Sequence, residues 1–318
     1  MKTNAIVRIV LFSLAIFLLL GVLGVGLGVT SYMVGFSEES GKTAVNSFDA
    51  VTVTPSPEDV GSHSFAFDPA RIRQIEIEWA SGSITIEPSD AVTEILIGES
   101  AVEEKYTMVC RQSGETLSIR FCKDSIKLSG FGVTIPDKDL VITVPAGWVC
   151  DSLEIDAASA DVRINDMNIQ ELDFDGASGK CDLTRCQVGS LDLDAASGNV
   201  TFSGCLDRLD FDGASADCTL VLTDCPSHID MEGMSGNLDI TLPSDCGFVV
   251  NTEGLSADFT TDFATTTRNG AHQYGDGSCS IEIAALSGKI CIRDGGYNCQ
   301  GSSHSHHAGE QEHHTDHH

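Results

Sequence analysis

Pairs of acidic residues recur along this 318-residue sequence, always at the same spacing from a serine. One acid stands five positions before the serine, and the other stands three positions before it. Calcium is a hard cation that takes several carboxylate oxygens, so stacked pairs of this kind are suited to hold it. The alternative is a solvated acidic face that sodium counterions neutralise. The candidate calcium ligands are Asp173, Asp175, Asp192, Asp194, Asp210, Asp212, Asp230 and Glu232.

Seven of the ten histidines gather in the last 18 residues, between Gly301 and the end of the sequence. Dense imidazoles beside carboxylates chelate Zn²⁺, Ni²⁺ or Cu²⁺. We predict a disordered tail over 301–318 that binds transition metals weakly, and no cofactor that the protein requires. The candidate ligands are His304, His306, His307, His313, His314, His317 and His318.

Six of the twelve cysteines share one phase, 8–11 residues before the next repeat serine. They are Cys150, Cys186, Cys205, Cys225, Cys246 and Cys279. A shared phase predicts that these cysteines lie along one edge of a stacked structure, where cysteines of neighbouring layers can form disulfides. An extracellular chain with an even number of cysteines favours disulfides, whereas an anaerobic host would leave free buried thiols. The connectivity stays open.

Four other cysteines have different predicted surroundings. Cys181 and Cys218 stand where other copies of the repeat carry Val or Leu, which predicts core positions. Cys110 and Cys122 flank a predicted hairpin and are candidates to bridge it.

A catalytic role finds no support in these patterns. The Gly-Ala-Ser segments at 176–178 and 213–215 resemble part of a nucleophile elbow, but that motif needs a second glycine and a following helix. The serine recurs eight times, and the paired carboxylates that a glycosidase needs recur in the same way. Because a catalytic constellation should be singular, we predict that the protein is not an enzyme.

The elements that position these residues are copies of one repeat. Clear copies are LDFDGASGKCDL at 172–183, LDLDAASGNVTF at 191–202 and LDFDGASADCTL at 209–220. Apolar and polar residues alternate on both sides of a small-residue corner, which is typical of strands with one buried face. One such arc cannot bury its own apolar face, so neighbouring arcs should stack. We predict an all-β fold, a β-solenoid of about 19 residues per coil; a β-sandwich is the alternative.

The section over 91–144 departs from the repeat and is predicted to cap the stack. The segment 108–122 has the pattern of an antiparallel hairpin that turns at Ser113-Gly114, and 140–145 is a strand closed by a proline.

The beginning of the sequence predicts a membrane anchor. Ile9–Val29 is an uncharged run of 21 residues, which as a helix reaches roughly 30 Å, the thickness of a bilayer core. We assign 1–8 to the cytoplasm, 9–35 to a signal-anchor helix, 36–64 to a linker and 65–300 to the repeat domain, which then lies outside the cell. The alternative is a cleaved signal peptide, for which the run is too long.

The net charge limits the classes of partner that the protein can bind. With 47 acids against 18 bases the formal charge is −29. No basic surface is available to displace counterions from phosphates, so nucleic acid is excluded as a partner.

The order of these features resembles the bacterial putative-adhesin family. An anchor is followed by IEIEWASGSITI at 75–86, a hairpin, LVITVPAG at 140–147 and then successive LxIxxxSGxIxL units. The resemblance implies an envelope-exposed, non-enzymatic β-strand-repeat domain in a bacterium, anchored in the cell membrane by one span. Its expected partners are the membrane and an unidentified surface ligand or envelope protein. The alternative function is that of an accessory of an envelope-stress signalling system.

Overall fold

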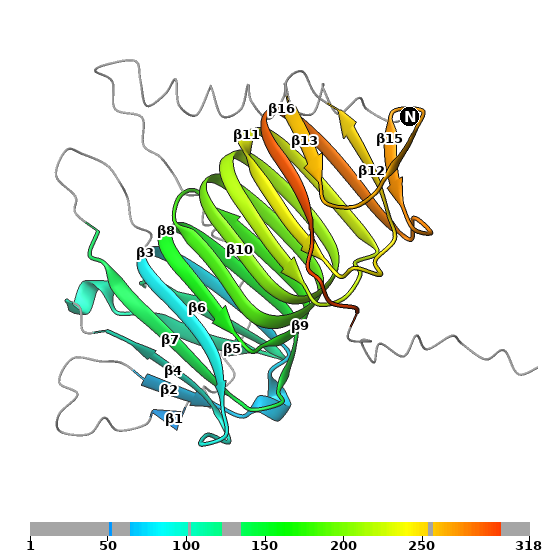
Figure 1. Ribbon diagram of the computed structural model, residues 1–318. Coiled ribbons are helices and arrows are strands. Elements are labelled where there is room, and N and C mark those ends of the chain that lie inside the picture. The colour runs from blue at the N-terminus through cyan, green and yellow to red at the C-terminus, as the bar shows by residue number, and fades with distance from the viewer. Residues whose placement is uncertain (1–50, 53–63, 101–102, 123–134, 254–256, 300–318) are drawn as a thin grey trace, which may run out of the picture.

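The computed structural model describes residues 51–52, 64–100, 103–122, 135–253 and 257–299. In these ranges the chain forms one 16-stranded sheet and has no α-helix. The helical elements there are two short 3₁₀ turns, η1 (Pro69–Arg71) and η2 (Glu104–Tyr106). Figure 1 shows the strands stacked as successive coils along one long axis. The prediction of a nearly all-β, solenoid-like fold is therefore confirmed.

The repeat copies form the long strands of this stack. They are β3 (Gln74–Ser89), β8 (Val149–Asn165), β9 (Asn168–Gly176), β10 (Lys180–Leu222), β11 (His228–Leu242), β12 (Phe248–Glu253), β13 (Ala257–Thr261) and β16 (Cys279–Asp294). Successive coils pair in parallel, and equivalent residues of the repeat lie side by side: Leu172 pairs with Leu153 and with Leu191.

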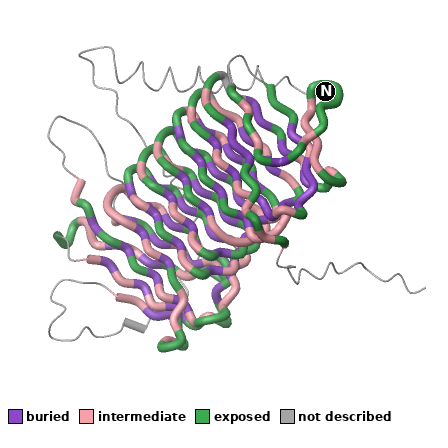
Figure 2. The backbone as a smooth tube through the Cα atoms, in the orientation of Figure 1, coloured by how far each residue is buried: buried purple, intermediate pink, exposed green. Residues whose placement is uncertain are grey.

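Alternating burial builds the core. Leu191 and Leu193 are fully buried, whereas the intervening Asp192 is exposed. Figure 2 shows the same alternation of buried and exposed positions along successive coils. Because the pattern repeats in register, the inward side chains of all coils merge into one continuous apolar cluster.

At several small-residue corners one strand continues through the corner: β8 passes through Ser159, and β10 passes through both Ser197 and Ser215. At the Ser178 corner the predicted pair of separate strands is present, because β9 ends at Gly176 and β10 begins at Lys180. At Gly198 the backbone has φ +133°, and a Cβ added there would lie 2.1 Å from the carbonyl oxygen of Gly179 in the preceding coil. Only glycine permits this close approach between coils.

The first coil is completed by the cap. Its strands are β1 (Val51–Thr52), β2 (Ser64–Phe67), β4 (Ile95–Glu99), β5 (Val109–Ser113), β6 (Thr116–Arg120) and β7 (Lys138–Pro145). β6 and β7 pair in parallel with the two halves of β3 and so take the place of a preceding repeat. The predicted hairpin is confirmed, because β5 and β6 pair antiparallel around Gly114 at φ +63°. The predicted linker contains one short strand, since β1 pairs with β2.

The far end of the stack does not follow the order of the sequence. β16, the last copy along the chain, pairs with β11 on one side and with β12 and β13 on the other. The earlier copy in β12 and β13 therefore becomes the end coil, and the β14 (Thr266–Arg268) and β15 (Ala271–Tyr274) hairpin adds to β12.

Side-chain polarity explains this exchange. The inward position held by Ile283 in β16 is held by Thr252 in β12, where the threonine is exposed. The more apolar copy thus occupies the position with a coil on each side, and the more polar copy faces the end, as end repeats do.

Of the helices in the described ranges, none is long and apolar enough to cross a membrane. The predicted anchor over 9–35 and the histidine-rich tail over 301–318 lie outside those ranges.

Candidate functional site

The acidic pairs form two columns on the outer face of the stack. In the first, Asp173 pairs with Glu154 on one side and with Asp192 on the other. In the second, Asp175 pairs with Asp156 and with Asp194. Further along, Asp210 pairs with Asp230 and Asp212 pairs with Glu232. The structure therefore places all eight predicted acids in these columns, each alternating with residues of the core.

Partial burial and repulsion between neighbours raise the pKa values of several carboxyl groups in the columns, Asp173, Asp192 and Asp194 among them. The pKa of Asp194 is raised to about 6, first by partial burial and then by repulsion from Asp175, Asp212 and Asp192. The pKa of Asp156 is raised by burial and by Asp175 and Asp173. A side-chain hydrogen bond with Asp175 also contributes to the raised pKa of both Asp156 and Asp194. Carboxyl groups of neighbouring coils therefore lie in close contact along the second column.

Positive charge is sparse along the columns. At the cap end, Arg120 Nε lies 3.3 Å from Glu78 Oε2, and the Ser118 hydroxyl donates a hydrogen bond of 2.7 Å to Glu76. Within the described residues, no group of three or more His, Cys, Asp or Glu side chains is arranged to hold a metal ion. The calcium prediction therefore stays a prediction.

The repeat serines form a ladder of their own at the corner. Ser159 and Ser178 lie 3.1 Å apart through their hydroxyl oxygens, and Ser235 donates to Ser215 at 3.5 Å. The Ser197 hydroxyl donates to the backbone carbonyl of Ala177 at 3.2 Å. These hydrogen bonds join neighbouring coils, so the repeat serines have a structural role at the corners.

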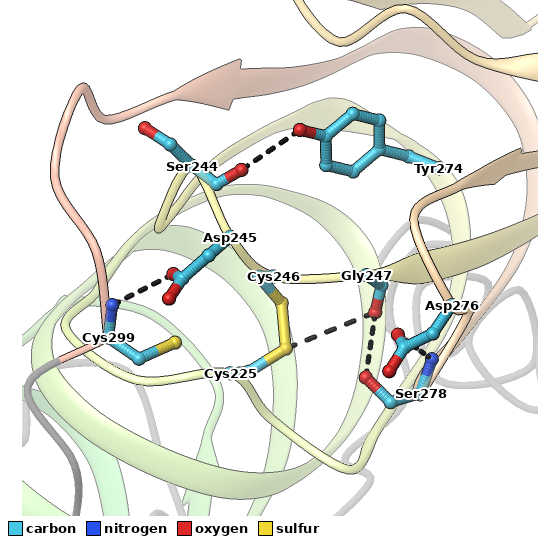
Figure 3. The surroundings of a disulfide bond; sticks show 9 residues. All are labelled: Cys225, Ser244, Asp245, Cys246, Gly247, Tyr274, Asp276, Ser278 and Cys299. Atoms are coloured by element: carbon cyan, nitrogen blue, oxygen red, sulfur yellow. Dashed lines mark hydrogen bonds between the residues drawn. A yellow bond between two sulfur atoms is a disulfide. The ribbon is translucent and has the colours of Figure 1, made fainter.

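One predicted edge pairing of cysteines is present. Cys225 and Cys246, on adjacent coils, form a disulfide with Cα atoms 5.3 Å apart (Figure 3). The prediction that edge cysteines of neighbouring coils pair is confirmed for this pair. Cys181 and Cys218 are buried core residues, as predicted. The candidate bridge between Cys110 and Cys122 is not formed in this structure, in which neither residue belongs to a disulfide.

A buried ion pair in the cap was not predicted from the sequence. The Lys138 ammonium and the Glu99 carboxylate lie 2.5 Å apart, and neither side chain is exposed. Lys138 also donates to the backbone carbonyls of Tyr106, at 2.7 Å, and of Phe121. Its Nζ lies 4.4 Å from the ring centre of Trp79. The signal was available in the alternation, because Lys138 is in phase with the buried Leu140, Ile142 and Val144.

Comparison with protein families identifies this fold. Residues 72–220 match the family described as Toastrack DUF4097. The match agrees with the resemblance to a bacterial putative-adhesin family of unknown function that the repeats indicated. No curated protein matches the sequence.

Three solved structures illustrate what the chain is similar to. A putative cell adhesion protein from Clostridium sporogenes has 11% identity and a TM-score of 0.35, with 73% of this chain and 98% of that chain covered. A putative adhesin from Bacteroides fragilis has 13% identity and a TM-score of 0.41, covering 76% and 99%. A putative lipid binding protein from Parabacteroides distasonis has 15% identity and a TM-score of 0.36, covering 73% and 96%.

Proposed function

We propose that this protein is a membrane-tethered surface protein whose β-solenoid has a binding or structural role without catalysis. In this proposal residues 9–35 form a single span, the first eight residues lie in the cytoplasm, and the repeat domain stands outside a bacterial cell. Cations modulate the domain through its acidic columns.

The observation that carries the proposal is the repetition of the same outward side chains in successive coils. Asp173, Asp192 and the acids that follow them present one chemical group at a regular spacing of about 4.8 Å, the distance between strands. A regular array offers many weak contacts to a polyvalent partner, whereas catalysis needs one position that differs from all others.

Cation dependence follows from the charge on this array. Residues 150–299 hold 26 acids and 7 bases. Two unit charges at the strand spacing repel by about 1 kcal/mol in bulk water, and by more at a lower effective dielectric. A divalent cation shared by carboxylates of adjacent coils would remove part of this repulsion and stiffen the stack.

The melting temperature of residues 65–300 across a calcium series tests the cation part. We expect a rise of several degrees with millimolar calcium after chelator treatment, and a smaller rise with magnesium at equal ionic strength. The rise should be lost in Asp175→Asn/Asp194→Asn, which removes column charge. It should persist in Asp166→Asn, because Asp166 pairs with Arg185 at 2.6 Å and lies outside the columns. Equal small shifts of the melting temperature with both ions would mean that the columns are a solvated acidic face, which cations only screen.

The location of the domain is tested with the full chain in bacterial cells. We expect the chain in the membrane fraction, resistant to alkaline extraction, with its repeat domain digested by protease added to cells whose outer barrier is permeabilised. Deleting residues 9–35 should release the domain from the membrane fraction. A protease-resistant domain in cells with an intact inner membrane would contradict the proposed orientation.

A further inference from the structure

Two thiols that the core does not bury lie beside the disulfide. Ten cysteines lie outside the disulfide; seven of them are buried, and the three half-buried ones are Cys122, Cys205 and Cys299. Cys122 belongs to the cap, whereas Cys205 lies on the cysteine edge and Cys299 ends the described part of the C-terminal segment.

Hydrogen bonds hold Cys299 in place. The segment after β16 runs back along the edge: Gly295 N donates to Leu242 O at 2.9 Å, and Tyr297 OH donates to Leu222 O at 2.8 Å. The backbone N–H of Cys299 then donates to Asp245 Oδ1 at 2.9 Å, one residue before the disulfide-bonded Cys246. Figure 3 shows Cys299 beside the Cys225–Cys246 disulfide.

Cys205 reaches the same place from the neighbouring coil. Bonds from Thr223 N to Gly204 O and from Ser227 N to Asp207 O, each 2.8 Å, set the coil of Cys225 directly against that of Cys205. Asp224 acts on the pKa of the Cys205 thiol, and Asp224 and the backbone of Cys225 act on that of Cys299, so both thiols lie around the segment 224–225. Cys205 and Cys299 therefore flank the same residue, Cys225, one from the neighbouring coil and the other from the C-terminal segment.

We propose that Cys205 and Cys299 form a second disulfide, which ties the end of the repeat domain to its edge. The oxidant is a low-molecular-weight disulfide. One thiolate attacks it to form a mixed disulfide and releases one thiol. The other cysteine then attacks the mixed disulfide, which forms the Cys205–Cys299 bond and releases the second thiol. Two electrons pass to the oxidant, and the two protons of the cysteines end on the released thiols.

The acidic surroundings of the two thiols slow this oxidation. Burial, the hydrogen bond to Asp224 and the charges of Asp224 and Asp207 raise the pKa of Cys205 to about 12. Burial and Asp245 raise the pKa of Cys299 as well. Because the thiolate is the attacking form, both thiols react slowly at neutral pH, and oxidation should take hours.

Tryptic mapping of the full chain tests the pairing. The protein is incubated with oxidised glutathione, unfolded in an alkylating agent without reductant, and digested. Cleavage after Arg185, Arg208 and Arg293 separates 186–208 from 209–268 and 294–318. We expect a linked product of 186–208 with 294–318, and the Cys225–Cys246 bond inside 209–268. A fully alkylated 294–318, or 294–318 linked to 209–268, would overturn the proposal.

Variants assign the linked sulfur and its effect. The linked product should vanish in Cys205→Ser and persist in Cys186→Ser, which shares the same tryptic peptide, and in Cys122→Ser. After oxidation, Cys205→Ser and Cys299→Ser should each lower the melting temperature by roughly 5–10 °C, and the double variant by no more than either. A link that survives Cys205→Ser, or additive losses in the double variant, would contradict the pairing.

Discussion

Gly198 is a residue at which the contact between two coils depends on the absence of a side chain. We predict that Gly198→Ala lowers the free energy of unfolding by at least about 2 kcal/mol, because alanine combines an unfavourable φ of +133° with a Cβ 2.1 Å from Gly179 O. Urea denaturation of residues 65–300 measures the change. Gly98→Ala is the matched control: nothing lies within 4 Å of its new Cβ, so we expect a change below about 0.5 kcal/mol.

Lys138 shows how strongly one buried charge can depend on its partner. Lys138→Met leaves the Glu99 carboxylate buried without its cation, so we predict a loss of about 3–5 kcal/mol. Adding Glu99→Gln should restore at least half of that loss, because no charge is then left in the core. Lys105→Met serves as control, since Lys105 and its partner Glu103 are exposed, and it should change stability by less than about 0.5 kcal/mol. Equal effects of the buried and exposed lysines in urea denaturation would contradict this assignment.

At the scale of the elements, the strands bring carboxyl groups together at a cost that depends on pH. The folded-state pKa of Asp194 is about 6, above its ordinary value of 3.8, so the folded protein binds the proton more tightly than the unfolded chain. The free energy of unfolding should therefore be higher at pH 5 than at pH 7.5, and the change should centre near pH 6, the folded-state pKa of Asp194. Urea midpoints measured without divalent cations at both pH values test this direction.

Two substitutions with opposite expected signs sharpen the pH prediction. Asp194→Asn should stabilise the domain at pH 7.5, by less than about 1 kcal/mol because the group is largely solvated, and should reduce the gain on acidification. Asp166→Asn should instead destabilise at pH 7.5, because a hydrogen bond from Arg185 lowers the pKa of Asp166. A domain that loses stability between pH 7.5 and pH 5 would show that column repulsion is not a leading contribution.

At the scale of the whole molecule, the exchange of the last two coils couples segments that a sequential stack would keep independent. β12 and β13 reach the rest of the stack through β16, which follows them in the sequence. The integrity of 248–261 should therefore depend on 281–292.

Hydrogen exchange of an Ile290→Asp variant tests this coupling. Ile290 is buried and pairs with Phe259, so a charge there should disrupt β16 and remove amide protection from β12 and β13 as well. The coils of β8 and β9 should keep their protection, because their partners lie elsewhere. Preserved protection over 248–261 would mean that β12 and β13 pack on β11 in sequence order.

Local spacing by itself determined much of this protein. The alternation in LDFDGASGKCDL and its recurrence about every 19 residues predicted the coils, the outward columns and the core positions of Cys181 and Cys218. Such features follow from which residues share a face, and a strand fixes that within a few positions. The shared phase of the edge cysteines predicted an adjacent-coil pairing for the same reason.

Contacts between distant segments were decided only by the tertiary structure. The alternation places Lys138 on the inner face, but only the fold supplies Glu99, Tyr106 and Phe121 to satisfy its ammonium group. The repeats fix the shape of each coil without fixing their order, because every copy offers its neighbours nearly the same edges. Position in the stack then depends on which copy better tolerates an uncovered side, so the copy with Thr252 lies at the end and the copy with Ile283 lies inside.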